Sequence, residues 1–297
     1  MQIIMDEDLN FFEEAPQDTE GLSAEELIFL DKLNLPEDIF FFQAFEGKVL
    51  LIKKMGVNLL FLNDVSQQSY IISPDLEEKA ISDQLWHSNL DLDIAQVIIV
   101  DSPLEAVYYD RLFNQDNSVY VYLSSTKNEA LSQFNAFIDK NFNRELLSFK
   151  IALKNSVKSF YQELRIIEAI TGEKFTFDSK ETVLCYTSNN KDKIDEVKSF
   201  FLKIKENINT TLIRTNFAIN DIVIFIQEEN IIKLKFPEFD LFKKESRKII
   251  LSMIEKLSFF HNVQIHRPNR TNLKELYNWK IINDIYFPRE EKKKKNK

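Results

Sequence analysis

The chain has 297 residues, 44% of them hydrophobic and 29% charged, which is ordinary for a globular protein of up to two compact domains. A single cysteine and three histidines exclude an internal disulfide framework, a multi-cysteine zinc site and a His-rich metal site. No apolar run approaches the roughly 20 residues of a membrane span, and the N-terminus lacks the layout of a secretory signal, so we expect a cytoplasmic protein without a membrane partner.

The net charge of −9 is unevenly distributed along the chain. Residues 1–20 contain seven acidic residues and no base, whereas residues 198–288 carry 15 Lys and Arg against 10 Asp and Glu. This asymmetry favours an anionic partner for the C-terminal third. The alternative is that each charged stretch is simply a solvated surface.

The N-terminal quarter predicts a disordered acidic leader followed by a small β-rich domain. Residues 1–22 form the leader, because they lack a sustained apolar period. At Ser23 a Ser-Ala-Glu-Glu capping box predicts a helix through Leu33. The domain 23–92 then continues as an antiparallel sheet, predicted from short apolar runs separated by turn signals at 38–46, 49–53, 58–63 and 69–72.

From residue 93, strands and helices alternate. Apolar strands are expected at 96–100, 118–123, 147–153 and 182–186, with helices between and after them at 103–112, 129–138, 157–170 and 192–205. Alternation of this kind predicts parallel β-α-β units. The expected fold class is therefore α/β, with a mostly parallel four-stranded core in residues 93–205 and Asp101 at its carboxyl edge.

The C-terminal third predicts an α+β module over residues 206–288. Strands are expected at 211–214, 222–227, 231–236 and 263–266, with a helix at 242–257 and a further helical stretch at 267–279. Residues 289–297 form a basic tail.

Two stretches carry a resemblance to a known family. Residues 84–89 read QLWHSN, and after about ten residues the segment 97–109 reads VIIVDSPLEAVYY. They resemble the "W-x-S-N … IVESPIDALSY" run of Toprim domain proteins encoded by Bacteroidetes mobile elements, which are similar to the Toprim domains of primases and topoisomerases. Residues 122–126, YLSST, lie where that family has a strand ending in "STGGN". The resemblance covers roughly residues 84–200 and implies a Toprim-like core.

The resemblance also implies which residues would form a Toprim centre. Such a centre needs a carboxylate after the first strand as general acid/base, and an Asp-x-Asp pair after the third strand that holds Mg²⁺. Asp101 stands where the family has Glu, and Glu105 where it has Asp. The Asp-x-Asp positions fall on 154–156 if 147–153 is the third strand, which we prefer, or on 187–189 if 182–186 is. Neither placement supplies two carboxylates, so the implied centre is degenerate, with no metal site.

Two groups of residues are candidates for function, and each has a plainer structural interpretation. Asp101 and Glu105 form a residual metal or phosphate site, or Asp101 is the N-cap of the helix that follows it. A basic group in the C-terminal third forms a phosphate-binding stripe, or part of it is the solvated face of an amphipathic helix. This group consists of Lys243, Lys244, Arg247, Lys248, Arg267 and Arg270.

The leading hypothesis is a catalytically degenerate Toprim-like protein that acts as a nucleic-acid-associated or adaptor component of mobile-element DNA processing. It needs no cofactor. One alternative is a Mg²⁺-dependent nuclease or primase-like enzyme that uses Asp101, Glu105 and a third carboxylate, and only this alternative requires Mg²⁺. The other is a structural protein-interaction module without a nucleic-acid role. A nucleic-acid partner and a protein partner both stay open, as does the oligomeric state.

Overall fold

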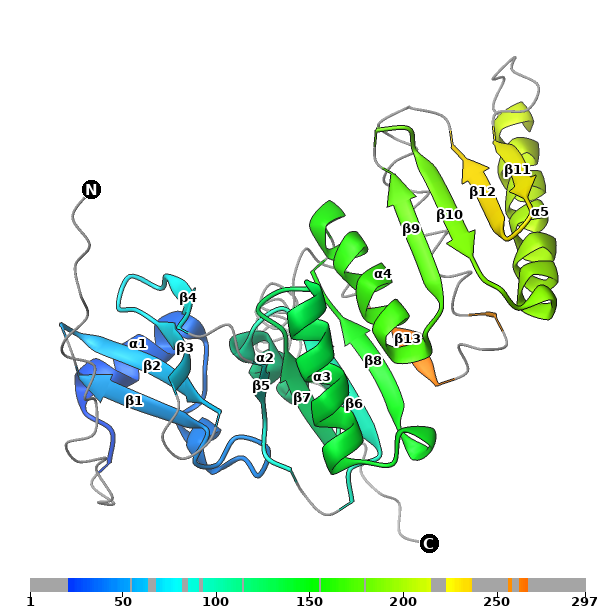
Figure 1. The fold of residues 1–297 in the computed structure, drawn as a ribbon. Helices are drawn as coiled ribbons and strands as arrows, with labels where there is room; N and C mark the ends of the chain where they lie inside the picture. Colours follow the sequence, from blue (N-terminus) through cyan, green and yellow to red (C-terminus); the bar gives the residue numbers. More distant parts are fainter. Residues whose placement is uncertain are drawn as a thin grey trace, which may run out of the picture.

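The structure, a computed structural model, describes residues 21–53, 55–63, 68–81, 85–90, 93–113, 115–154, 156–178, 180–214, 223–236, 256–257 and 262–266. Most of the predicted leader, nearly all of the predicted helix 242–257, and residues 267–297 lie outside them. Three sheets organise the described residues. They follow one another along the molecule, with the sheet that contains the parallel strands in the middle (Figure 1).

The N-terminal sheet is antiparallel, with strand order β1-β2-β3-β4. Its strands are β1 (Val49–Lys53), β2 (Val57–Leu62), β3 (Gln68–Ile72) and β4 (Glu78–Ala80). Helix α1 (Ala24–Leu33) precedes it and begins with the predicted capping box. Ser23 Oγ accepts from the Glu26 amide at 3.4 Å, and the Glu26 carboxylate accepts from the Ser23 amide at 2.7 Å.

The strand predicted at 38–46 does not form. Residues Glu37–Phe41 are instead the 3₁₀ helix η1, which follows Pro36. Ile39 and Phe45 are fully buried, whereas Phe41 is 80% exposed. A strand, with its period of two, would bury Phe41 together with Ile39 and Phe45, so the exposure of Phe41 fits 3₁₀ and turn backbone and not a strand.

The central sheet has the strand order β13-β8-β6-β7-β5. Its members are β5 (Trp86–His87), β6 (Gln96–Val100), β7 (Ser118–Tyr122), β8 (Ser148–Ala152) and β13 (Val263–Ile265). Strand β6 pairs in parallel with both β7 and β8, and β13 pairs in parallel with β8. Strand β5 pairs antiparallel with β7 at the other edge.

The C-terminal sheet is wholly antiparallel, with the order β11-β12-β10-β9. It consists of β9 (Lys174–Asp178), β10 (Val183–Thr187), β11 (Ile224–Glu228) and β12 (Ile231–Lys235).

The expected Toprim-like, mostly parallel four-stranded core is therefore wrong. The apolar run predicted as its fourth strand is β10, which lies in the C-terminal sheet rather than beside β6 to β8. The fold is mixed α/β, and two of the three sheets in the described residues are entirely antiparallel. The reason is the unpredicted strand β9. A short connection joins β9 to β10, and so short a link allows only antiparallel pairing.

Four helices accompany these sheets: α2 (Pro103–Phe113), α3 (Asn128–Asn141), α4 (Val157–Thr171) and α5 (Lys191–Arg214). A short 3₁₀ helix, η2 (Arg144–Leu146), precedes β8. Helix α5 runs through 211–214, where a strand was expected. The helix buries residues at a spacing of three to four: Val197, Phe201, Ile204 and Ile208. This helical period continues past residue 205, where the helix was expected to end. None of the helices in the described part of the chain has the length and apolar composition needed to cross a bilayer.

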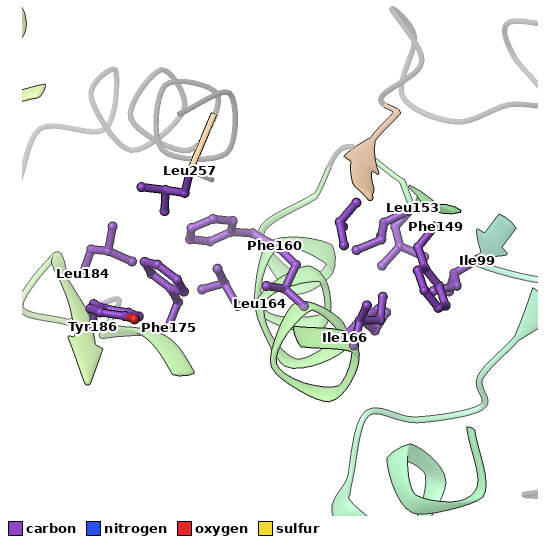
Figure 2. Packing of buried hydrophobic residues seen from close by; sticks show 14 of the residues in the cluster. Ile99, Phe149, Leu153, Phe160, Leu164, Ile166, Phe175, Leu184, Tyr186 and Leu257 are labelled. Carbon is purple, nitrogen blue, oxygen red and sulfur yellow. The ribbon is translucent and has the colours of Figure 1, made fainter. Parts of the chain in front are cut away.

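Two hydrophobic clusters cover the two faces of the central sheet. One joins α1, α2 and the N-terminal sheet to one face, and the other joins α3, α4, α5 and the C-terminal sheet to the opposite face. Helix α4 lies between two sheets. Figure 2 shows its Phe160 and Leu164 on the side of Phe175, and its Ile166 on the side of Phe149. The central and C-terminal sheets thus share one core.

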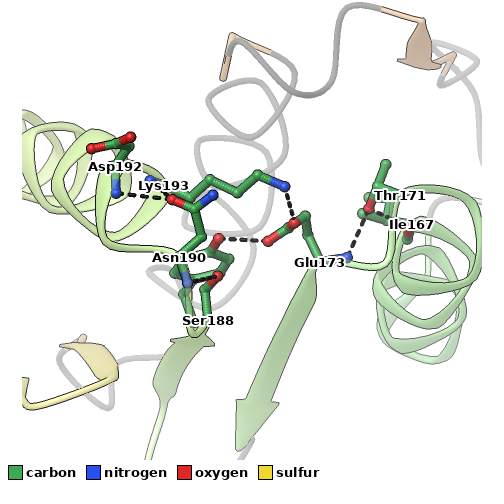
Figure 3. A network of polar contacts seen from close by, with 8 residues as sticks. Ile167, Thr171, Glu173, Ser188, Asn190, Asp192 and Lys193 are labelled. Carbon is green, nitrogen blue, oxygen red and sulfur yellow. Dashed lines mark hydrogen bonds and ion pairs between the residues drawn. The ribbon is translucent and has the colours of Figure 1, made fainter.

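A polar network ties the end of α4 to the start of α5 (Figure 3). Glu173, 8% exposed, accepts a hydrogen bond from the hydroxyl of Tyr186 at 2.6 Å and forms an ion pair with Lys193. The Glu173 amide donates to Thr171 Oγ1 at 3.1 Å. At the other side of the network, Asn190 Oδ1 accepts from the Asp192 amide at 2.9 Å at the first turn of α5.

Candidate functional site

A polar cavity lies at the carboxyl ends of the parallel strands. The carboxyl ends of β6, β7 and β8 meet at one edge of the central sheet, which is where ligands bind in open α/β sheets. The loops that follow these strands, together with the first two turns of α4, enclose a volume of about 230 Å³. The lining residues that carry polar groups are Asp101, Tyr122, Ser124, Thr126, Lys154, Ser156, Lys158, Ser159 and Gln162.

Three helices begin at this edge, because α2, α3 and α4 each follow one of the three strands. The N-terminus of a helix carries partial positive charge and unpaired amide hydrogens. Ser156 caps α4, its Oγ accepting from the Ser159 amide at 3.0 Å. The N-cap of α3 is Lys127, whose side chain makes no capping hydrogen bond. The surroundings of the cavity therefore favour an anion.

Asp101 joins the ends of two strands. Its carboxylate accepts a hydrogen bond from the backbone amide of Lys154, so the residue after β6 is fastened to the loop after β8. It does not cap α2. The Ser102 hydroxyl accepts from the Glu105 amide at 3.3 Å instead. Burial raises the pKa of the Asp101 carboxyl, against the lowering effects of the Lys154 amide and of the charges on Lys154 and Lys158.

Replacing Asp101 by asparagine should change how stability depends on pH. The pKa of Asp101 is raised in the folded state, so the protonated carboxyl stabilises the fold. This contribution is complete below the unfolded pKa of about 3.9. It is lost as pH rises through the folded pKa. Asparagine keeps an acceptor for the Lys154 amide and cannot ionise. We expect Asp101→Asn to match wild type in acid and to become relatively more stable as pH rises. Urea unfolding at a series of pH values measures the difference in unfolding free energy between the variant and wild type. A variant that became less stable than wild type as pH rises would contradict the prediction.

Glu105, the second acidic residue predicted for the site, does not line the cavity. It lies in the first turn of α2 and is 6% exposed. Another carboxylate, Glu78 of β4, accepts from the Tyr70 hydroxyl at 2.6 Å, and its charge also raises the pKa of Asp101. Among the described residues, no group of three or more His, Cys, Asp or Glu side chains is placed to hold a metal ion.

The two stretches on which the Asp-x-Asp pair could fall, 154–156 and 187–189, lie at the ends of strands in different sheets. Lys154 and Ser156 follow β8 and line the cavity beside Asp101. Residues 187–189 are the last residue of β10 and the two that follow it, in the C-terminal sheet and away from the end of β6. The six basic residues predicted to bind phosphates, Lys243, Lys244, Arg247, Lys248, Arg267 and Arg270, lie outside the described residues.

Of the polar lining residues, only Asp101 was predicted as a site residue. Tyr122, Ser124, Thr126, Lys154 and Ser156 lie in stretches that were compared with the Toprim family, and no function was predicted for Lys158, Ser159 and Gln162 of α4. Ser159 is 3% exposed, and its hydroxyl lies 2.8 Å from that of Ser156. A signal for them exists in the sequence, since Ser156 follows an apolar strand and a lysine stands two residues further on. A serine N-cap followed by a lysine in the first turn is unusual, because the helix dipole disfavours a cation there unless an anion is near.

No family model, curated protein or solved structure matches the chain. The Toprim resemblance therefore stays a prediction that depends on residues 84–126, and function has to be argued from the cavity.

Proposed function

We propose that this chain is a non-catalytic, nucleic-acid-associated protein that binds a phosphate group in the cavity at the carboxyl edge of β6, β7 and β8. One observation supports it most: two lysines, several hydroxyls and the N-terminus of α4 line a cavity that only one carboxylate lines among the described residues. Hydrogen bonds from charged donors to phosphate oxygens are about twice as strong as neutral ones. The resemblance of residues 84–109 to Toprim proteins of mobile elements supports nucleic acid as the source of the phosphate, in the cytoplasm.

The same residues favour binding over catalysis. Metal-assisted cleavage of a phosphodiester needs carboxylates that converge on the ion. At this edge the carboxylate of Asp101 is engaged by the Lys154 amide, and a lysine stands where the resemblance places one of the metal-binding aspartates. A lysine repels a cation and attracts a phosphate. The enzyme alternative would therefore require carboxylates from outside the described residues.

Reversing the charge of Lys158 should weaken binding of single-stranded and double-stranded DNA and of RNA that carry a terminal phosphate by about tenfold. The change removes one phosphate contact and adds a repulsive charge, and it should lower the dependence of affinity on salt by about one ion. Lys158 is exposed, so Lys158→Glu should leave folding intact. Fluorescence anisotropy of labelled strands, titrated at low and at physiological salt, measures both effects.

The matched control is Lys140→Glu, which makes the same charge change on an exposed lysine in the last turn of α3, at the opposite end of that helix from the cavity. It should leave affinity nearly unchanged. Equal weakening by both variants would mean that net charge, not this cavity, governs binding. If wild type binds none of the nucleic acids at low salt, the proposed function is wrong and the protein-interaction alternative becomes the better hypothesis.

A further inference from the structure

We infer that the cavity takes a phosphate monoester, the chemistry of a phosphorylated strand end or of a mononucleotide, rather than a phosphodiester inside a strand. This inference rests on the proposed function and narrows its ligand. It depends on the shape of the cavity, its charge and its capacity for hydrogen bonds.

The cavity is closed on its inner side. Its inner wall is apolar and buried, with none of these residues more than 7% exposed: Ile99, Val100, Leu123, Leu153 and Ile166. The polar side chains lie on the loops and on the first turns of α4, which leaves entry from that side. A strand end or a small molecule can enter such a pocket and contact these polar groups.

The volume suits a single phosphate group with part of a sugar. At roughly 30 Å³ for each water in the liquid, a cavity of about 230 Å³ holds about seven waters. A phosphate group and the sugar carbon that carries it fit within that space.

The charge suits a dianion. A monoester carries a second negative charge above a pKa near 6, and a diester never does. Lys154 and Lys158 supply two positive charges, and the N-terminus of α4 adds a partial one. A single carboxylate, that of Asp101, opposes them among the described lining residues.

The hydrogen-bond donors suit three terminal oxygens. Hydroxyls come from two loops, with Ser124 and Thr126 after β7 and Ser156 after β8, and Gln162 adds an amide on the second turn of α4. A monoester presents three terminal oxygens to such donors and a diester only two.

The test compares oligonucleotides of one sequence that carry a 5′-phosphate, a 3′-phosphate or hydroxyls at both ends, with a nucleoside monophosphate and inorganic phosphate as competitors. We expect the full-length protein to bind a strand with a phosphorylated end at least about tenfold tighter than the strand with hydroxyl ends. A gain of this size corresponds to the hydrogen bonds that charged groups make with the terminal phosphate. Lys158→Glu should remove this preference and Lys140→Glu should keep it. Competition by the monophosphate as strong as that of the phosphorylated strand would identify a mononucleotide as the source of the monoester.

Two results would separate the failure of this inference from that of the proposed function. Equal affinity for phosphorylated and hydroxyl strands, with both weakened by Lys158→Glu, overturns the monoester and leaves phosphate binding at the cavity in place. Absence of binding to every strand at low salt overturns both.

Discussion

Replacing Phe160 by alanine is expected to lower the free energy of unfolding by about 3–5 kcal/mol, the range for deleting a fully buried aromatic ring. Phe160 has no exposed surface and packs edge-on against Phe177 of β9, with ring centroids 5.3 Å apart. It lies on the side of α4 that faces the C-terminal sheet (Figure 2). Because α4 lies between two sheets, the lost ring removes contacts that hold them in one core. Urea unfolding followed by circular dichroism measures the change.

The matched control is Phe41→Ala, the same deletion at a ring that is 80% exposed. We expect it to change the unfolding free energy by no more than about 0.5 kcal/mol, as for surface positions in general. Similar losses in both variants would show that Phe160 does not occupy a shared core. A loss confined to Phe160→Ala, with two separate unfolding transitions in place of one, would show that the sheets fold independently and would also contradict the shared core.

Replacing Glu173 by alanine is expected to cost about 2–3 kcal/mol. Removing one partner of a fully buried ion pair costs about 3–5 kcal/mol. The loss here should be smaller, because the Lys193 side chain is 34% exposed and can be hydrated. The Tyr186 hydroxyl is buried and would lose the Glu173 carboxylate as an acceptor. The destabilisation should appear in urea unfolding, and Glu173→Gln should recover part of it by still accepting from Tyr186.

An exposed ion pair provides the control for Glu173. Glu228 pairs with Lys233 at 2.7 Å on the C-terminal sheet, and its side chain is 54% exposed. Glu228→Ala should cost less than about 1 kcal/mol, as surface ion pairs do. If the two alanine variants were equally stable, burial of Glu173 would contribute nothing and the network in Figure 3 would be a surface feature.

Part of the candidate site followed from local sequence signals. The apolar run before Asp101 and the Pro103 helix start predicted a strand end followed by a helix, and the cavity lies there. The preferred position for the end of the third strand placed Lys154 and Ser156 at the same edge. The α4 side chains were not predicted, because only the packing of that helix against β6 to β8 turns Lys158 and Gln162 toward Asp101.

Local patterns in the sequence were sufficient for most individual helices and strands, such as the capping box at Ser23 and the apolar strand 96–100, because caps and periodicity act over a few residues. Strand partners were decided by the tertiary structure alone. A five-residue apolar run such as 183–187 suits a parallel or an antiparallel neighbour equally well. In the structure this run is β10, which forms an antiparallel hairpin with β9. The strand that pairs with β8 on its other side is β13, which lies far along the chain. Pairing depends on which buried surfaces meet in space, and that is a property of the whole fold rather than of any one segment.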